Sequence, residues 1–228
     1  MTLEARPQGL PLSVDETLLG TLSLGVLEAD GVGLRPLARA FVDERDRIVQ
    51  RLIGSYAGRQ PADIPGVAEA RSLFHRLGID PTKTRPSSEA LLRRVLQGKG
   101  LPTLHPAVDV CNLSSLEHQL PLGLYDRGKV RGPVRVRVGR DGEGYDGIRK
   151  QRVHLAGRLL LADDDGPFGA PTSDSARTAV GDDTRHLMVV VFCPVDRAGH
   201  SLSAALEHLA GWLTRYCSAS VLAVRVIQ

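Results

Sequence analysis

The densest group of small and polar residues in the chain lies in the segment 163–178, DDDGPFGAPTSDSART. Three aspartates precede a Gly-Pro pair, and several hydroxyl side chains follow. Glycine allows a ligand to approach the backbone closely. Exposed backbone N–H groups together with Ser and Thr hydroxyls form a cradle for an oxyanion or a phosphate. The alternative interpretation is a solvated loop between two strands, in which Asp174 and Ser175 make local turn hydrogen bonds.

A second polar group lies in the segment 108–126, VDVCNLSSLEHQLPLGLYD. Asp109, Asn112 and Ser115 are spaced three residues apart, which places them along one side of a helix. Buried Asn and Ser need hydrogen-bond partners, so this side belongs either to a polar site or to a helix end with its caps. Each segment holds small and polar residues between strongly apolar elements. We therefore expect 108–126 and 163–178 to face each other across one cleft.

Positive charge is concentrated between Arg127 and Arg158. The formal net charge of the chain is only +3, but this stretch holds ten basic and three acidic residues. Arginine binds phosphates in a bidentate manner, so the stretch favours contacts with RNA phosphates. The residues expected to make these contacts are Arg135, Arg137, Arg149, Lys150 and Arg152. The alternative is a solvated strand face, and Tyr145, the one aromatic residue of the stretch, offers little base stacking.

Several classes of site lack their sequence signatures. The chain has no Walker loop and no HExxH or GxSxG motif. The histidines lack metal-ligand spacing and the cysteines lack a CxxC pair, so neither a metal nor another cofactor is expected. No apolar run approaches the ~18 residues of a membrane span, and the acidic, proline-broken N-terminus is unlike a secretory signal. These features predict a cytoplasmic protein with no membrane and no DNA partner.

The elements that position these residues follow from hydrophobic periodicity and from Gly and Pro boundaries. Apolar runs predict strands over 17–29, 186–195 and 221–227 and a strand or strand pair over 153–163. The alternation of 133–139 predicts a half-exposed strand with its arginines facing outward. Helical spacing predicts helices over 36–54, 67–78, 87–98 and 201–217 and within 107–119, and Ser87 or Ser88 could cap the third helix of the chain.

This order of elements predicts an α+β fold rather than βαβ alternation. A strand and several helices come first, and the second half consists mostly of strands. We expect an N-terminal strand and helix, residues 1–64, to pack on the core of a second region, residues 65–228.

The two polar segments resemble the editing module, or B3/B4 domain, of the phenylalanyl-tRNA synthetase beta subunit. Members of that family show a V-D-(V/I)-x-N start, a Glu, a Pro and a closing aromatic-Asp pair. This chain supplies Val108, Asp109, Val110, Asn112, Glu117, Pro121, Tyr125 and Asp126. The loop FGAPTSDSART is similar to the family's FGG-x-x-S loop through Phe168, Gly169 and Ser173. The resemblance covers about residues 65–228, and the first 60 residues resemble free-standing members of the family.

The resemblance implies a partly open, multi-stranded sheet or sandwich with flanking helices. It also implies a pocket in which a mischarged amino acid on tRNA is hydrolysed. Such a pocket is needed because a hydrophobic synthetic site rejects an isostere with one extra hydroxyl only weakly.

Two departures from the family pattern bear on the chemistry. Gly123 stands where the family has its editing His, and Ala170, Pro171 and Thr172 stand in the region of its editing Glu. Specificity for tyrosine is therefore not expected. The sequence also shows neither an ATP-binding nor an anticodon-binding domain, so the chain is not expected to charge tRNA by itself.

We therefore hypothesise a protein that binds tRNA or an aminoacyl group and could act as a free-standing editing hydrolase. Thr172 or Ser173 would hold the water, and Asp174 would act as the base or orient that water. The ligand-binding residues would be Asn112, Ser115, Tyr125, Asp126, Gly166, Phe168, Gly169 and Arg177. The alternatives are noncatalytic binding of tRNA or aminoacyl groups, and a binding protein for a free amino acid or small metabolite. Only RNA binding should weaken steeply with salt.

Overall fold

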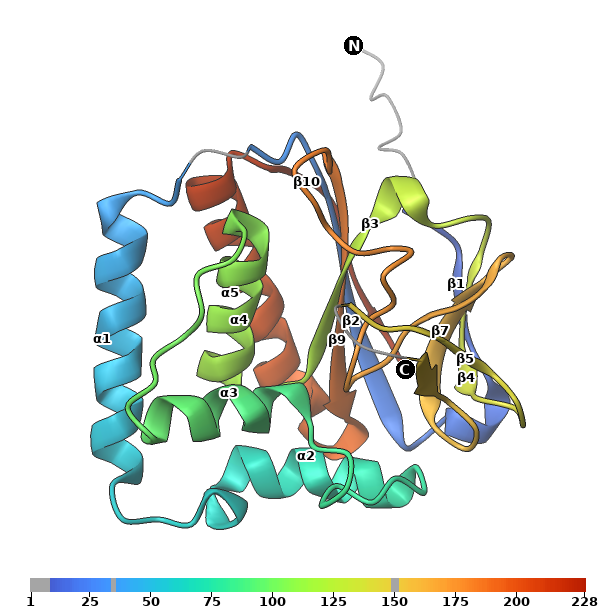
Figure 1. Cartoon of the computed structure of the whole chain (residues 1–228), viewed down its shortest axis with the longest axis horizontal. Coiled ribbons are helices and arrows are strands. Elements are labelled where there is room, and N and C mark those ends of the chain that lie inside the picture. The colour runs from blue at the N-terminus through green and yellow to red at the C-terminus, as the bar shows by residue number, and fades with distance from the viewer. Residues whose placement is uncertain (1–8, 34–35, 149–151) are drawn as a thin grey trace.

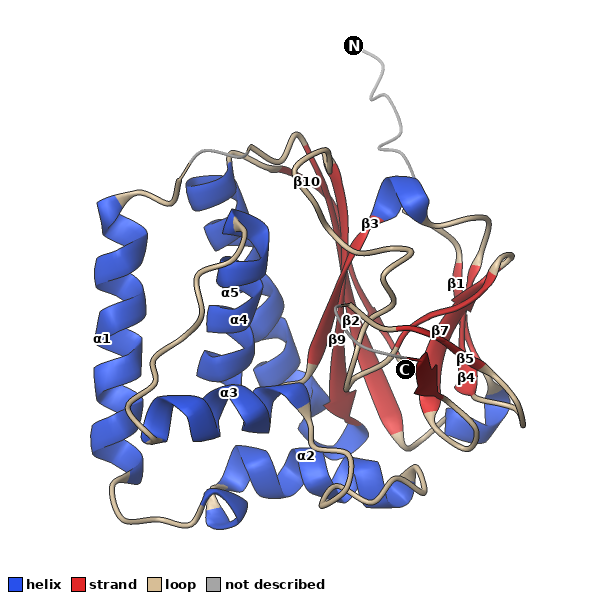
Figure 2. Cartoon of the chain, in the orientation of Figure 1, coloured by secondary structure: helices blue, strands red, loops and turns tan. Residues whose placement is uncertain are grey.

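The computed structural model describes residues 9–33, 36–148 and 152–228. These residues form five α-helices and ten strands. Helices cover one face of a central sheet and a second sheet packs on the other face (Figure 1, Figure 2). The predicted α+β class is confirmed. Within the described ranges, no helix is long and apolar enough to cross a membrane.

The central sheet is antiparallel throughout, with the strand order β10-β2-β9-β3. Its strands are β2 (Leu22–Asp30), β3 (Leu122–Asp126), β9 (His186–Pro194) and β10 (Ser220–Ile227). Both faces of β9 are buried, as its continuous apolar run predicts. Because β2 lies between β9 and β10, the first 64 residues and the remainder of the chain contribute to one sheet.

The second sheet has the strand order β1-β4-β7-β8, and β1 pairs with β4 in parallel. Its strands are β1 (Leu12–Val14), β4 (Val134–Val138), β7 (Leu159–Asp163) and β8 (Gly166–Gly169). The alternation of β4 buries Val134 and Val136 and leaves Arg135 exposed, as predicted. A separate two-stranded ribbon consists of β5 (Gly144–Asp146) and β6 (Arg152–His154).

All five predicted helices are present. They are α1 (Arg39–Tyr56), α2 (Pro65–Arg76), α3 (Ser87–Leu96), α4 (Pro106–His118) and α5 (Ser203–Cys217). The apolar sides of α4 and α5 share one core with the central sheet, in which Leu113 and Leu209 are fully buried. The close approach of α5 explains Gly25 in β2, because a β-carbon there would lie 2.9 Å from Leu202 Cδ1. A larger residue at this position would require the side chains of Leu202 and Leu206 to move.

Two sequence predictions need correction. The strand predicted from residue 17 begins at Leu22, because Asp15 accepts the backbone N–H of Thr17 and starts a short 3₁₀ turn. Neither Ser87 nor Ser88 caps α3, whose N-cap position is Pro86. The segment 153–163 forms a strand pair, one of its two predicted forms, because a turn in which Gly157 has a φ of +70° separates β6 from β7. The strands β1, β3, β5 and β8 were not predicted.

A candidate aminoacyl-binding cavity

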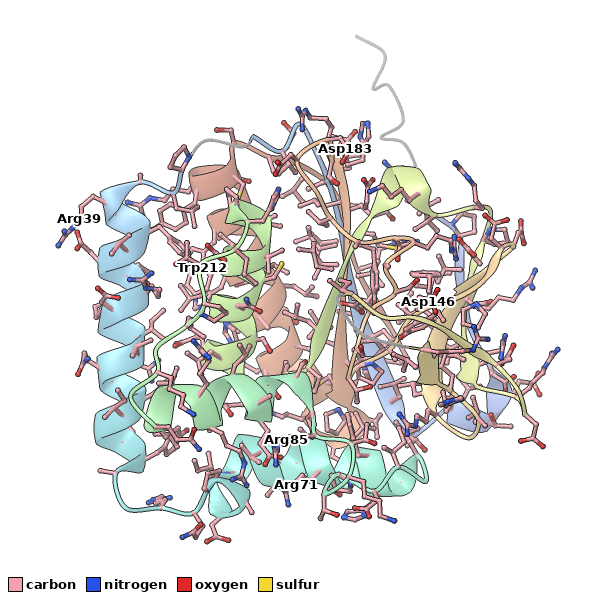
Figure 3. The ribbon with its side chains drawn as sticks, viewed as in Figure 1. Arg39, Arg71, Arg85, Asp146, Asp183 and Trp212 are labelled. Carbon is pink, nitrogen blue, oxygen red and sulfur yellow. The ribbon has the colours of Figure 1, made fainter. Side chains whose placement is uncertain are left out.

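A cavity of about 570 Å³ lies beside β3, the edge strand of the central sheet. The N-terminal half of α4 forms one wall, and the loop that follows β8 forms the opposite wall. Asn112 and Asp174 both line this cavity, so the structure confirms that 108–126 and 163–178 face each other across one cleft. Figure 3 labels Asp146, at the end of β5, and Asp183. Both are close in the sequence to residues that line the cavity, Ile148 and Asp182.

The lining of the cavity is mostly aliphatic, with a few polar groups. The aliphatic side chains are Leu104, Val108, Leu122, Leu124, Ile148 and Val180. The other lining residues are His105, Cys111, Asn112, Asp174, Gly181 and Asp182. An apolar pocket with a small number of placed polar groups is the usual form of a small-ligand site.

His105 is held at the cavity by the start of α4. It is the N-cap residue of that helix, and its Nδ1 accepts a hydrogen bond from the Ala107 backbone N–H at 3.2 Å. Burial lowers the pKa of His105, although the charges of Asp182 and Asp109 oppose this effect. The ring is therefore neutral at pH 7, with its proton on Nε2. Sequence reasoning missed this residue, and the available signal was a His-Pro pair at the expected start of a helix.

A buried tyrosine approaches Asp174 from the other side of β3. The hydroxyl of Tyr125 is close enough to the Asp174 carboxylate for the two groups to interact electrostatically. Burial raises the pKa of Tyr125 well above its usual value, and the negative charge of Asp174 raises it further, so the phenol keeps its proton. A β-carbon at Gly123 or at Gly169 would overlap the Tyr125 hydroxyl. These two glycines therefore create the space in which the Tyr125 hydroxyl lies.

The backbone around Asp174 is fixed by hydrogen bonds on both sides. The Tyr145 hydroxyl donates to the Ser173 carbonyl, and the Ile148 N–H donates to the Asp174 carbonyl at 3.2 Å. Burial, followed by the charge of Asp174, raises the pKa of Tyr145, so this phenol also stays protonated. Thr172 and Ser173 are half-buried neighbours of Asp174 in the chain, but of these three residues only Asp174 lines the cavity.

Cys111 lines the cavity as a thiol. It is buried, and burial raises its pKa far above the usual value for cysteine, with smaller contributions from Cys217 and Asp174. A nucleophile of the cysteine type must be a thiolate near neutral pH. Cys111 therefore acts as an apolar wall residue. Within the described part of the chain, no group of three His, Cys, Asp or Glu side chains could hold a metal ion.

Four residues expected to bind ligand instead connect parts of the fold around the cavity. Ser115 donates to the Leu120 carbonyl at 2.8 Å, at the end of α4. Asp126 accepts from Thr184 Oγ1 at 2.7 Å. Phe168 is fully buried and meets the Tyr125 ring edge-on, with 5.0 Å between the ring centroids. Arg177 makes two hydrogen bonds to Asp163, at 3.0 and 2.7 Å.

The remaining expected ligand residues lie close to Tyr125 or at the start of β8. Gly169 contacts the Tyr125 hydroxyl, as described above, and Gly166 begins β8 with a φ of +107°. A positive φ of this kind favours glycine, so conformation alone accounts for Gly166.

The expected RNA-binding residues differ in their surroundings. Arg135 is exposed and lies 3.6 Å from Asp164, and Arg137 makes a bidentate pair with Glu143 at 2.6 and 2.7 Å. Arg152 is exposed. Arg149 and Lys150 lie outside the described residues. Part of the positive charge on β4 is thus balanced within the protein.

The sequence of this chain is similar to those of known proteins. Residues 69–217 match the B3/4 domain family, and the chain therefore belongs to that family. It is 26% identical over 202 residues to the phenylalanine–tRNA ligase beta subunit of Neisseria meningitidis serogroup B, an alignment that covers 83% of this chain and 25% of the relative. The same subunit of Streptomyces avermitilis is 37% identical over 109 residues, covering 46% of this chain and 12% of the relative.

A solved structure supports the same fold. An N-terminal fragment of the phenylalanyl-tRNA synthetase beta subunit from Pyrococcus horikoshii superposes with a TM-score of 0.50 and 13% sequence identity. The superposition covers 97% of this chain and 52% of that fragment. This chain spans a quarter or less of the length of the ligase subunits named above.

Proposed function

We propose that this protein binds the aminoacyl end of an aminoacyl-tRNA in the cavity beside β3 and hydrolyses its ester bond. Membership of the B3/4 family, whose relatives here are phenylalanine–tRNA ligase subunits, supports an RNA-linked amino acid as the ligand. The volume of about 570 Å³ is within the range of small-molecule sites, so the cavity could hold an aminoacyl group with part of the terminal nucleotide.

The observation that carries this proposal is the charge of the lining. Among the described residues that line the cavity, the acidic ones are Asp174 and Asp182, and the lining contains no Lys or Arg. A free amino acid brings a carboxylate of its own, which these aspartates would repel. An aminoacyl ester has lost that negative charge and keeps only its ammonium group. The lining therefore favours the ester over the free amino acid.

The chemistry requires only one positioned water molecule, because the ester is already activated. Asp174 would accept a proton from this water as the water oxygen bonds to the ester carbonyl carbon. The bond from that carbon to the ribose oxygen then breaks, and the proton passes to the ribose oxygen. Thr172 or Ser173 would help to hold the water. Tyr125 would help to orient the Asp174 carboxylate, because its hydroxyl lies close to that group.

The basic stretch would bind the tRNA backbone. Ile148 lines the cavity and is followed directly in the sequence by Arg149 and Lys150. Phosphate contacts from Arg135, Arg152 and these two residues would hold the tRNA while its end enters the cavity. Such contacts specify no amino acid, so recognition of the aminoacyl group would depend on the cavity alone.

A deacylation screen over a panel of mischarged tRNAs tests the proposal. We expect hydrolysis of at least one species, and a loss of about 100-fold or more for Asp174→Asn, a typical effect of removing a positioned acid–base group. The Asp146→Asn variant serves as the control, because Asp146 is exposed at the end of β5 and does not line the cavity. Binding of aminoacyl-tRNA without hydrolysis would instead indicate a noncatalytic binding protein. Salt-insensitive binding of a free amino acid would contradict the proposal.

A further inference from the structure

The cavity divides into an aliphatic side and a charged side. One side is an aliphatic wall, which consists of Val108 from α4 and Leu122 and Leu124 from β3. The opposite loop supplies both carboxylates, Asp174 and Asp182, and one further aliphatic residue, Val180. No described lining residue is Phe, Tyr or Trp. A ligand that fits this division has a cationic group at one end and an apolar, non-aromatic group at the other.

We infer that the aminoacyl group bound here has an aliphatic side chain of about the size of leucine. This inference rests on the proposed function and names its substrate class. The α-ammonium group would lie on the side of Asp174 and Asp182, and the side chain would lie against Val108, Leu122 and Leu124.

Polar side chains of the same size are disfavoured for two physical reasons. An amide placed against aliphatic walls loses hydrogen bonds to water that the walls cannot replace. An acidic side chain would in addition meet the negative charge of the two aspartates. Each methylene that a pocket accommodates improves binding about tenfold or more, so alanine should also bind less tightly than leucine.

The test measures binding of non-hydrolysable analogues, in which an amide replaces the ester between the amino acid and the 3′ position of adenosine. Leucyl, alanyl, asparaginyl, aspartyl and tyrosyl analogues are compared by titration calorimetry. Leucine and asparagine are similar in size, so this pair isolates the effect of polarity. We expect the leucyl analogue to bind at least about tenfold more tightly than each of the others.

Two isosteric variants report whether the aliphatic wall is responsible. Val108→Thr adds a hydroxyl to the wall and should weaken binding of the leucyl analogue about threefold to tenfold, with a smaller effect on the asparaginyl analogue. The control is Val138→Thr, because Val138 is 37% exposed on β4 and does not line the cavity. Unchanged thermal unfolding of both variants shows that the fold is intact.

The outcomes separate this inference from the proposed function. If the asparaginyl or tyrosyl analogue binds as tightly as the leucyl analogue, the aliphatic class is wrong while an aminoacyl site remains. If Val108→Thr affects all analogues equally, the wall does not select the side chain and the inference is again overturned. If no analogue binds, the proposed function itself fails.

Discussion

The hydroxyl group of Tyr125 lies close to the carboxylate of Asp174, in a space that exists because Gly123 and Gly169 have no side chains. The relationship connects a buried residue of β3 with the polar wall of the cavity. It also bears on Gly123, at the position where the family resemblance implies an editing His. Any side chain at that position would overlap the Tyr125 hydroxyl, so a histidine fits there only if Tyr125 moves.

Tyr125→Phe should reduce hydrolysis by about tenfold while the protein stays folded. The Phe ring keeps the edge-on contact with Phe168, and the substitution removes only the buried hydroxyl. The acid side of the pH–rate profile should move to higher pH, because a carboxylate that loses a nearby hydroxyl group binds protons more readily. Tyr216→Phe is the control, since Tyr216 packs on Phe41 away from the cavity. An unchanged pH profile would show that Tyr125 does not position Asp174.

Gly123→Ala should destabilise the protein by about 1–3 kcal/mol, because its β-carbon requires Tyr125 to move. Urea unfolding measures the change. Gly54→Ala is the matched control, since no atom lies within 4 Å of a β-carbon at this position in α1. That substitution should stabilise the protein by about 0.5–1 kcal/mol, as alanine is the better helix former. Equal effects of the two substitutions would contradict the close packing of Tyr125.

Glu89 forms a separate structural centre between α2 and α3. Its carboxylate is fully buried and lies near Arg71, Arg85 and Arg93, with Arg71 Nε at 2.7 Å (Figure 3 labels Arg71 and Arg85). Burial alone would raise the pKa of Glu89, but the hydrogen bonds from Arg71 and Arg93 together hold it below the usual value. The folded state therefore binds the Glu89 proton less readily than the unfolded chain does.

Glu89→Gln should lower the unfolding free energy by about 3 kcal/mol, because it leaves the surrounding arginines without their buried partner. The pH dependence has a defined sign. The contribution of Glu89 is complete above its unfolded pKa of about 4.3 and is lost as the pH falls through its lower folded pKa. Urea unfolding between pH 7 and pH 3 should show this loss in the parent protein but not in the variant. A variant that shows the same acid sensitivity would assign the effect to other carboxylates.

The sequence predicts the helices and the long strands, and the structure shows why it misses part of the cavity. Local signals mark helix ends, such as Pro65 at the start of α2 and Gly98 after α3. The strand β9 is predicted because it is apolar from Leu187 onward. The strand β3 is short and contains a glycine, and it forms because Pro121 and the residues after it pair with β9. Val180 and Ile148 reach the cavity from loops whose course depends on tertiary contacts, so their sequence neighbourhood contains no signal of a site. Phe168 and Arg177 both belong to the polar segment 163–178. The side chain of Phe168 is nevertheless buried in the core, and that of Arg177 is hydrogen-bonded to Asp163.

Binding of tRNA should depend on the basic stretch in a salt-dependent manner. Replacing Arg149, Lys150 and Arg152 by Ala should weaken binding and reduce the slope of log K against log salt by about 0.7–0.9 for each lost phosphate contact. A triple variant of Arg39, Arg45 and Arg47 is the charge-matched control, because each of these arginines on α1 already pairs with a neighbouring carboxylate. If both triple variants change the slope equally, only the net charge matters and the stretch is a solvated face.

Tyrosyl-tRNA should be hydrolysed slowly or not at all. A buried phenol needs an acceptor, and burying it without one costs about 1–3 kcal/mol. Ala170 and Pro171, in the region of the editing Glu of related sequences, offer no side-chain acceptor, and the Thr172 hydroxyl is a weaker, neutral one. The cavity wall formed by Leu122 and Leu124 offers none either. The space near Gly123 is already taken by the hydroxyl of Tyr125 itself.

The assay compares tyrosyl-tRNA with leucyl-tRNA and other mischarged species at one enzyme concentration, for the parent protein, Thr172→Ala and Asp174→Asn. We expect leucyl-tRNA to be hydrolysed at least about tenfold faster than tyrosyl-tRNA, which is the discrimination that unfavourable burial of one unpartnered hydroxyl supplies. The activity should fall in Asp174→Asn and, to a smaller extent, in Thr172→Ala. Rapid hydrolysis of tyrosyl-tRNA that persists in both variants would place the reaction outside this cavity, because neither the water-orienting carboxylate nor the nearby hydroxyl would then contribute.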